Sequence, residues 1–271
     1  DKPLVSVVIP YYNRHDTIEE TICSLEAQTL KDFEVIIVDD GSVAEQTKER
    51  LAEISKSKLR PHVITQKNAG VAEARNNGIG QSKGKYIVCL DSDDVLRPMH
   101  LEKCIAVLES DPSVALVTTG IEAFGVSVWS HIHQPYDPAQ LFVVNLASTA
   151  SMYRREAWEA SGGYKNKIGY EDWDLWLSMA EKGYWGRRIP ELLFRYRTAI
   201  ESRFVEDRSN HDNNVRMIQK HHPQYYKQVR SLRRERRYKK EIINPTTAFM
   251  NMSSKDKFAR ESARPHALLL M

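Results

Sequence analysis

Short apolar runs alternate with helical patterns through the first third of the chain. The runs occupy residues 4–10, 33–38, 62–65 and 86–90 and are rich in Val and Ile. Strands that alternate with helices need right-handed crossover connections and therefore form a mostly parallel sheet. This feature predicts an α/β fold with a mostly parallel central sheet flanked by helices.

Capping patterns predict where the helices between these strands begin. Asp16 and Glu19 have the spacing of a capping box, and Ser42 and Glu45 repeat that spacing after the second run. A third helix is expected from Val71. These helices would connect the strands of the parallel sheet.

The second part of the chain is predicted to mix short strands with helices. Apolar residues indicate strands at 114–120, 148–153, 184–188 and 192–198. Helical spacing indicates helices after Pro98 and at 155–161 and 170–182. The irregular segment 121–145 is expected to be a loop-rich insertion that faces the substrate.

Three carboxylates among four residues end the fourth apolar run: Asp91, Asp93 and Asp94. They follow the carboxyl end of a predicted strand, where open α/β sheets bind ligands. Like charges this close disfavour one another's ionisation and call for a counter-charge. A hard divalent cation such as Mg²⁺ or Mn²⁺ is the simplest one. The cluster predicts a metal site, with a solvated acidic turn as the alternative.

Other polar loops also follow strand carboxyl ends, namely 11–14, 39–40 and 68–76. The loop after the first strand carries neither of the Gly-rich phosphate-binding patterns, Gly-x-Gly-x-x-Gly or Gly-x-x-x-x-Gly-Lys-Ser/Thr. The diphosphate of a ligand would therefore be neutralised by a metal and by side chains.

A second acidic group opens the predicted helix 170–182 and consists of Glu171, Asp172 and Asp174. Trp173 and Trp176 recur at helical spacing and would anchor this helix in the core. Acids in a first turn are stabilising through the helix dipole, which is a sufficient structural explanation for one or two of them. A rigidly held acid beside a Gly-containing loop also suits a catalytic base.

Composition limits the partners and the compartment. A net charge of +3 is too small to indicate nucleic acid, whereas the basic stretch from Lys227 to Lys240 fits either a solvated helix or peripheral contact with anionic lipid. The Cys residues lack paired or metal-like spacing, and no apolar run could span a bilayer. We expect a cytoplasmic protein that contacts the inner membrane surface at most peripherally. Because residue 1 is not Met, the natural chain is open to an earlier start.

Six motifs resemble family 2 glycosyltransferases of the GT-A fold, and the match covers about residues 4–200. The motifs occupy 6–14, 38–42, 68–76, 90–94, 162–164 and 170–176. The resemblance implies a Rossmann-like GT-A domain at 1–205, with a nucleotide-sugar half at about 1–95 and an acceptor half at about 96–205. Residues 206–271 would form a basic, helical C-terminal extension.

The resemblance also implies an activity. It is the inverting transfer of a sugar from a nucleoside-diphosphate sugar, with UDP first by family frequency, to an acceptor hydroxyl. The acceptor would be a carbohydrate or lipid-linked, in cell-surface polysaccharide or glycoconjugate synthesis, and Mn²⁺ or Mg²⁺ would be the cofactor.

The resemblance assigns roles to residues of the motifs. The donor base, ribose and sugar would be held by Pro10, Tyr12, Asp40 or Asp39, Arg75 and Asp91. Further donor-binding candidates in the same motifs are Asn13, Arg14, Asn68 and Ser92.

Metal-binding and catalytic roles follow in the same way. Asp93 would be the main metal ligand and Asp91 a second one. His211 is the candidate third ligand, because Ala199 stands where many relatives carry a histidine. Asp172 would be the general base, and Glu171 would orient the loop or bind acceptor hydroxyls.

Two alternatives to a glycosyltransferase remain. A non-catalytic nucleotide-sugar-binding module of a polysaccharide-assembly complex would be expected to lack Asp93 or Asp172, and both are present. A sugar nucleotidyltransferase would want a Gly-rich, basic loop after the first strand. The sequence leaves the oligomeric state open.

Overall fold

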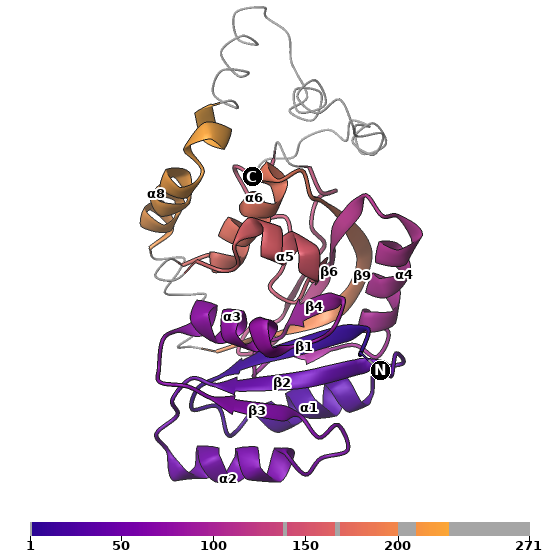
Figure 1. Ribbon diagram of the computed structural model, residues 1–271, viewed down its shortest axis with the longest axis vertical. Coiled ribbons are helices and arrows are strands. Elements are labelled where there is room, and N and C mark those ends of the chain that lie inside the picture. The colour runs from indigo at the N-terminus through magenta and orange to yellow at the C-terminus, as the bar shows by residue number, and fades with distance from the viewer. Residues whose placement is uncertain (1, 138–139, 166–168, 200–209, 228–271) are drawn as a thin grey trace, which may run out of the picture.

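The computed structural model describes residues 2–137, 140–165, 169–199 and 210–227 (Figure 1). The strands are β1 Val5–Tyr11, β2 Phe33–Asp39, β3 His62–Thr65, β4 Tyr86–Cys89, β5 Val95–Leu96, β6 Val114–Gly125, β7 Trp129–His131, β8 Met152–Arg154 and β9 Trp185–Thr198. The helices are α1 Ile18–Glu26, α2 Glu45–Ile54, α3 Val71–Gln81, α4 His100–Ser110, α5 Arg155–Ser161, α6 Glu171–Glu181 and α8 His211–His221.

One sheet runs through the described part of the chain in the order β3-β2-β1-β4-β8-β6-β9-β5, and β7 pairs with β6. The first four strands in this order are parallel, as the sequence predicts. Beyond them the sheet is mixed, because β8 is antiparallel to both β4 and β6, whereas β6 and β9 are parallel. The pairing of β4 with β8 joins the predicted nucleotide-sugar and acceptor halves in a single sheet.

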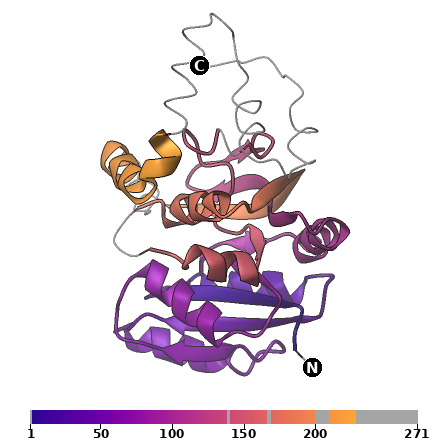
Figure 2. The same cartoon turned by 45° about the horizontal axis from the view of Figure 1, so that its top comes forward.

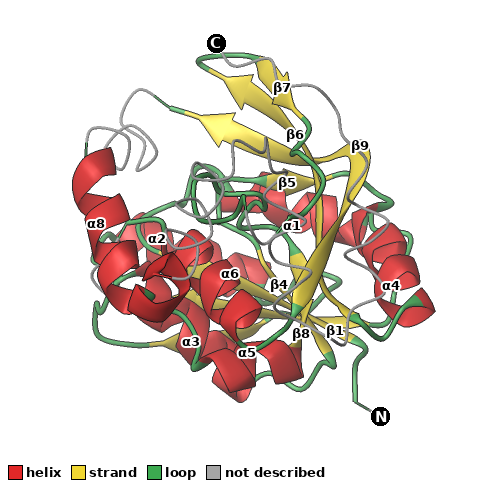
Figure 3. Cartoon of the chain, turned by 90° about the horizontal axis from the view of Figure 1, so that it is seen from above, coloured by secondary structure: helices red, strands yellow, loops and turns green. Residues whose placement is uncertain are grey.

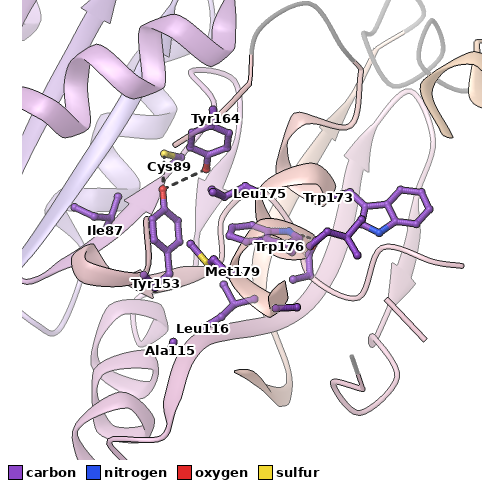
Figure 4. Close-up of a cluster of buried hydrophobic side chains, with 14 of the residues drawn as sticks. Ile87, Cys89, Ala115, Leu116, Tyr153, Tyr164, Trp173, Leu175, Trp176 and Met179 are labelled. Atoms are coloured by element: carbon purple, nitrogen blue, oxygen red, sulfur yellow. Dashed lines mark hydrogen bonds between the residues drawn. The ribbon is translucent and has the colours of Figure 1, made fainter. Parts of the chain in front are cut away.

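Two hydrophobic cores lie on opposite faces of the sheet, because successive side chains of a strand point to opposite faces. Val7 and Ile9 of β1 pack with α1, α2 and α4. Val8 packs with α3, α5 and α6. Figure 2 shows the helices in layers on the two sides of the strands. In the second core, Trp176 lies beside Tyr153, as Figure 4 shows, so α6 is anchored as the Trp spacing predicts.

The predicted helix caps are wrong. The N-cap residues are Thr17 for α1 and Ala44 for α2, and neither makes a side-chain capping hydrogen bond. Asp16 precedes the N-cap and instead lies 2.9 Å from the ring of His15. Ser42 lies ahead of the α2 N-cap, and its hydroxyl accepts a hydrogen bond from the loop after β1. Asp16 and Ser42 therefore contact other polar groups of the loops after β1 and β2 instead of capping a helix.

The predicted strands 184–188 and 192–198 are one strand, β9. Its register against β6 shifts between Thr119 and Gly120, which pair with Ile189 and Leu192. Pro190 falls within this shift, and a bulge accommodates a residue that has no N–H to donate. The proline that separates the two apolar runs in the sequence therefore lies in an irregularity of a continuous strand.

Helix α8 is held to α6 by a buried acid. Asp174 is fully buried, and its Oδ1 lies 2.9 Å from His221 Nδ1 and 3.2 Å from His222 Nε2. Its Oδ2 lies 3.4 Å from Lys165 Nζ. One of the three acids in the first turn of α6 therefore has a structural role.

The described part of the C-terminal extension is helical, as predicted. The basic stretch beyond Lys227 lies outside the described residues, so its contact with lipid stays a prediction. Among the helices that the structure describes, none combines the length and the apolar character needed to cross a bilayer.

Candidate active site

A cleft of about 690 Å³ opens where the carboxyl ends of β1, β2 and β4 face the start of α6. Parallel strands bring their terminal loops to one edge of the sheet, so motifs far apart in sequence meet there. The cleft collects most of the predicted site residues: Pro10, Tyr12, Arg14, Asp40, Asn68, Arg75, Asp91, Ser92, Asp93, Glu171, Asp172 and His211. The predicted clustering of polar loops at one sheet edge is confirmed.

Asn13 and Asp39 are not among the residues that line the cleft, and their predicted contact with the donor stays a prediction. Asp39 Oδ1 accepts a hydrogen bond from the Ser42 amide. Asn13 has φ 51°, and its Oδ1 accepts a hydrogen bond from the Val43 amide. Both side chains fix the loops after β1 and β2, and these loops in turn position the neighbouring lining residues.

Asp40 lines the cleft but also shapes a loop. Its Oδ1 accepts hydrogen bonds of 2.8 Å from Gln66 Nε2 and from the Ala69 amide, and its Oδ2 accepts one from the Gly70 amide. Gly70 has φ 92°, which only glycine adopts readily. Asp40 therefore holds the loop that leads into α3, and its predicted contact with the donor base stays a prediction.

Arg75 of α3 joins the two acidic motifs. It is 2% exposed, and its two terminal nitrogens lie 2.7 Å from Asp91 Oδ1 and 2.7 Å from Glu171 Oε1. Its guanidinium also lies over the ring of Tyr164. Burial alone lowers the pKa of Arg75, but Asp91 and then Glu171 raise it well above its usual value. These contacts give Arg75 a positioning role, and its predicted contact with the donor base stays a prediction.

Asp172 follows Glu171 at the start of α6. Its Oδ1 accepts a hydrogen bond of 2.8 Å from the Trp173 amide, and its Oδ2 accepts one of 3.0 Å from Asn145 Nδ2. Burial, and then the charge of Glu171, raise the pKa of Asp172 to about 6. A carboxylate with this pKa is ionised at neutral pH and is a stronger proton acceptor than an ordinary aspartate, as a general base requires.

The raised pKa predicts the pH dependence of turnover. A general base works only when deprotonated, so kcat/KM should rise with pH through about 6 and fall about tenfold per pH unit below that value. Because the Asn145 hydrogen bond lowers the pKa of Asp172, Asn145→Ala should move this midpoint to higher pH. A pH–rate profile of parent and variant measures both effects, and a flat profile between pH 5 and pH 7 would contradict the assignment.

Asp93 is the carboxylate best suited to bind a cation. Burial, and then the charge of Asp91, raise its pKa, so its negative charge is incompletely balanced. Arg14 lies beside it, with its Nε 3.9 Å from Asp93 Oδ2. Asp91 shares its charge with Arg75, and Asp94 accepts a hydrogen bond from the Arg197 amide. The donor set fits a divalent cation that takes its remaining ligands from water and a diphosphate.

The predicted metal set Asp91, Asp93 and His211 is not assembled as a group. Within the ranges that the structure describes, no three His, Cys, Asp or Glu side chains gather closely enough to hold a metal ion. His211 lines the cleft from α8, where its Nδ1 lies 3.2 Å from the Tyr170 hydroxyl. The helix that carries His211 packs on α6, so the distance to the β4 end is set by packing that the sequence does not show.

The sequence reasoning missed three residues of the site. Asn145 bonds the predicted base, and Arg197 Nε donates to the backbone carbonyl of Asp93. Tyr170 holds the left-handed backbone conformation, φ 62°, immediately before α6. A non-glycine residue in this conformation is strained and often marks a functional site. The contacts of Asn145 and Arg197 leave no local signal, because each joins segments distant in sequence.

Comparison with known proteins shows which family this chain resembles. Residues 6–166 match the family described as Glycosyl transferase family 2. TuaG of Bacillus subtilis, named as a teichuronic acid biosynthesis glycosyltransferase, is 33% identical over 209 residues, which are 74% of this chain and 81% of TuaG. Chondroitin synthase of Pasteurella multocida is 32% identical over 186 residues, which are 67% of this chain but 19% of that protein.

Solved structures show the fold. S. aureus TarS 1–349 in complex with UDP-GlcNAc has a TM-score of 0.65 at 18% identity and matches 74% of this chain and 60% of its own. Mannosyltransferase PcManGT from Pyrobaculum calidifontis, in complex with GDP-Man and Mn²⁺, has a TM-score of 0.64 at 19% identity, over 79% of this chain and 63% of its own. The fold is therefore of the GT-A type. With the family match spanning more than half of the sequence, the chain belongs to glycosyl transferase family 2.

Proposed function

We propose that this glycosyltransferase moves a sugar from a UDP-sugar to an acceptor hydroxyl with inversion, dependent on Mn²⁺ or Mg²⁺, in the synthesis of a cell-surface polysaccharide or glycoconjugate. One observation carries the proposal. A single cleft holds an acid suited to bind a cation, Asp93, and a half-buried acid whose pKa is raised to about 6, Asp172. They come from different elements, the end of β4 and the start of α6.

The relatives support the choice of substrates. UDP-GlcNAc is bound in the TarS structure, and GDP-Man with Mn²⁺ in the PcManGT structure. TuaG and chondroitin synthase are named for polysaccharide products. These products support a carbohydrate or lipid-linked acceptor.

The residues of the cleft suggest how the transfer proceeds. Asp172 accepts the proton of the acceptor hydroxyl as that oxygen attacks the anomeric carbon, and the nucleoside diphosphate leaves from the opposite face. Asp93 and Asp91 would hold a cation, which supplies positive charge to the departing diphosphate. Arg14 adds a fixed positive charge beside Asp93. Arg75 keeps Glu171, and with it the start of α6, against the donor side of the cleft.

A panel of nucleotide sugars tests the activity. The purified protein with Mn²⁺ should release nucleoside diphosphate from one UDP-sugar faster than from the others. Excess EDTA should lower this release at least tenfold, and added Mn²⁺ or Mg²⁺ should restore it, because a cation held at Asp93 would supply positive charge to the departing diphosphate beyond that of Arg14. Asp93→Asn should resemble the chelated parent and keep the parent's Tm. Full release in excess EDTA would refute the metal dependence.

A further inference from the structure

Two aromatic residues on different strands face the same way beside the cleft. Trp129 of β7 and Tyr196 of β9 both pair with Ala123 of β6, one from each side. Residues directly opposite each other in a sheet project to the same face. The three side chains therefore form a row across the strands, and Figure 3 shows β7, β6 and β9 together at one end of the sheet.

The two rings of the row lie side by side and are tilted toward each other. The ring centroids of Trp129 and Tyr196 are 6.3 Å apart with planes at 39°. Ala123 between them is fully buried, and its small side chain leaves both rings uncovered at this point of the row. The next row on the same face places Ile121 beside Phe194, and both also line the cleft. We call Trp129, Tyr196, Ile121 and Phe194 the aromatic platform.

The platform is continuous with the catalytic part of the cleft. All of its residues line the same cavity as Asp172 and Asn145. Trp129 is 36% exposed, a large apolar side chain left open on the surface. Exposed apolar patches beside polar groups mark ligand-binding grooves. The platform lies in the predicted acceptor half, whereas Asp91, Asp93 and Arg14 belong to the predicted nucleotide-sugar half.

The chemistry of the platform favours a sugar ring over a lipid chain. A pyranose presents a face of C–H groups that packs on an aromatic ring, while its hydroxyls point outward to polar partners. Such partners are present in the lining, as the side chains of Asn145, Ser148 and Thr149. A hydrocarbon chain would leave these polar groups without partners.

We propose that the aromatic platform binds a pyranose ring of the acceptor, so that the acceptor is a glycan; this inference rests on the proposed function. Trp129 stacks on the ring and Tyr196 extends the surface. The hydroxyl to be glycosylated is then presented along the cleft toward Asp172. The platform is a specificity-determining subsite distinct from the donor-binding loops.

The test is glycan binding by the full chain. Parent, Trp129→Ala, Trp129→Phe and Val128→Ala proteins are applied to a printed array of bacterial and glycosaminoglycan oligosaccharides of two to six residues. Val128 is the matched control, because it neighbours Trp129, is 80% exposed and is absent from the cleft lining. Tm values establish that each variant is folded. Hydrolysis of UDP-sugars by the parent protein, with Mn²⁺ and without an acceptor, is measured separately.

We expect the parent to bind at least one glycan class and Trp129→Ala to weaken that binding at least tenfold. Trp129→Phe should keep most of it, and Val128→Ala should stay within twofold of the parent. Equal glycan binding by parent and Trp129→Ala would overturn the proposal, as would a hydrolytically active parent that binds no glycan. Binding to phosphatidylcholine–phosphatidylglycerol vesicles that needs Trp129, without glycan binding, would also overturn it. Glycan binding that needs Trp129, in a parent that transfers no sugar from the UDP-sugar panel to that glycan, would support the platform and refute the proposed transfer.

Discussion

Asp172→Asn should lower kcat by about 100-fold or more, the range that a positioned general base contributes. Asparagine keeps the size of the side chain and an acceptor for the Trp173 amide, so α6 should keep its start. It cannot take a proton from the acceptor hydroxyl. UDP and Mn²⁺ should bind as in the parent, because neither contact depends on the proton acceptor.

The measurement is single-turnover kinetics with the donor identified by the nucleotide-sugar panel, together with calorimetry for UDP. Glu45→Gln is the control, because Glu45 also stands in the first turn of a helix but is absent from the cleft lining. If the acids of α6 only complement its dipole, both variants should behave alike and cost well under 1 kcal/mol of stability. A kcat within threefold of the parent would remove Asp172 from the mechanism.

Arg75→Met should lower the free energy of unfolding by about 3–5 kcal/mol, the usual cost of removing one partner from a buried ion pair. Methionine fills much of the same volume but leaves the Glu171 carboxylate, which is 7% exposed, without its cation. Asp91 also loses its partner. The variant should therefore melt earlier and bind donor more weakly, because Asp91 and the start of α6 are no longer tied together.

Urea unfolding of Arg75→Met and Arg50→Met compares the loss of a buried arginine with the loss of an exposed one. Arg50 likewise contacts two carboxylates, those of Glu19 and Glu53, but its side chain is 35% exposed and theirs are 66% and 65% exposed. Arg50→Met should cost less than about 1 kcal/mol. Arg75 also lowers the pKa of Asp172, so the pH–rate midpoint of Arg75→Met should lie above about 6. Equal stability losses in the two variants would refute the positioning role.

Much of the fold was predictable because the relevant signals are local. Apolar runs such as 33–38 and 86–90 are buried on both faces of the sheet, so their composition alone predicted parallel strands. The order of motifs indicated the family. Caps were not predictable in the same way, since Asp16 pairs with its neighbour His15 and Ser42 accepts a hydrogen bond from the distant Asn13 amide.

The sequence by itself determined that one group of carboxylates follows a buried strand, β4, and that a second group opens a helix, α6. Only the tertiary structure decided how each acid is used. Arg75 donates hydrogen bonds to Asp91 and Glu171, and Asn145 donates one to Asp172. Asp174 is hydrogen-bonded to a histidine at the end of helix α8. These partners are far away along the chain, and the burial that raises the pKa of Asp172 exists only once the elements pack. Charge depends on residue type, whereas the free energy of that charge depends on the surroundings that folding creates.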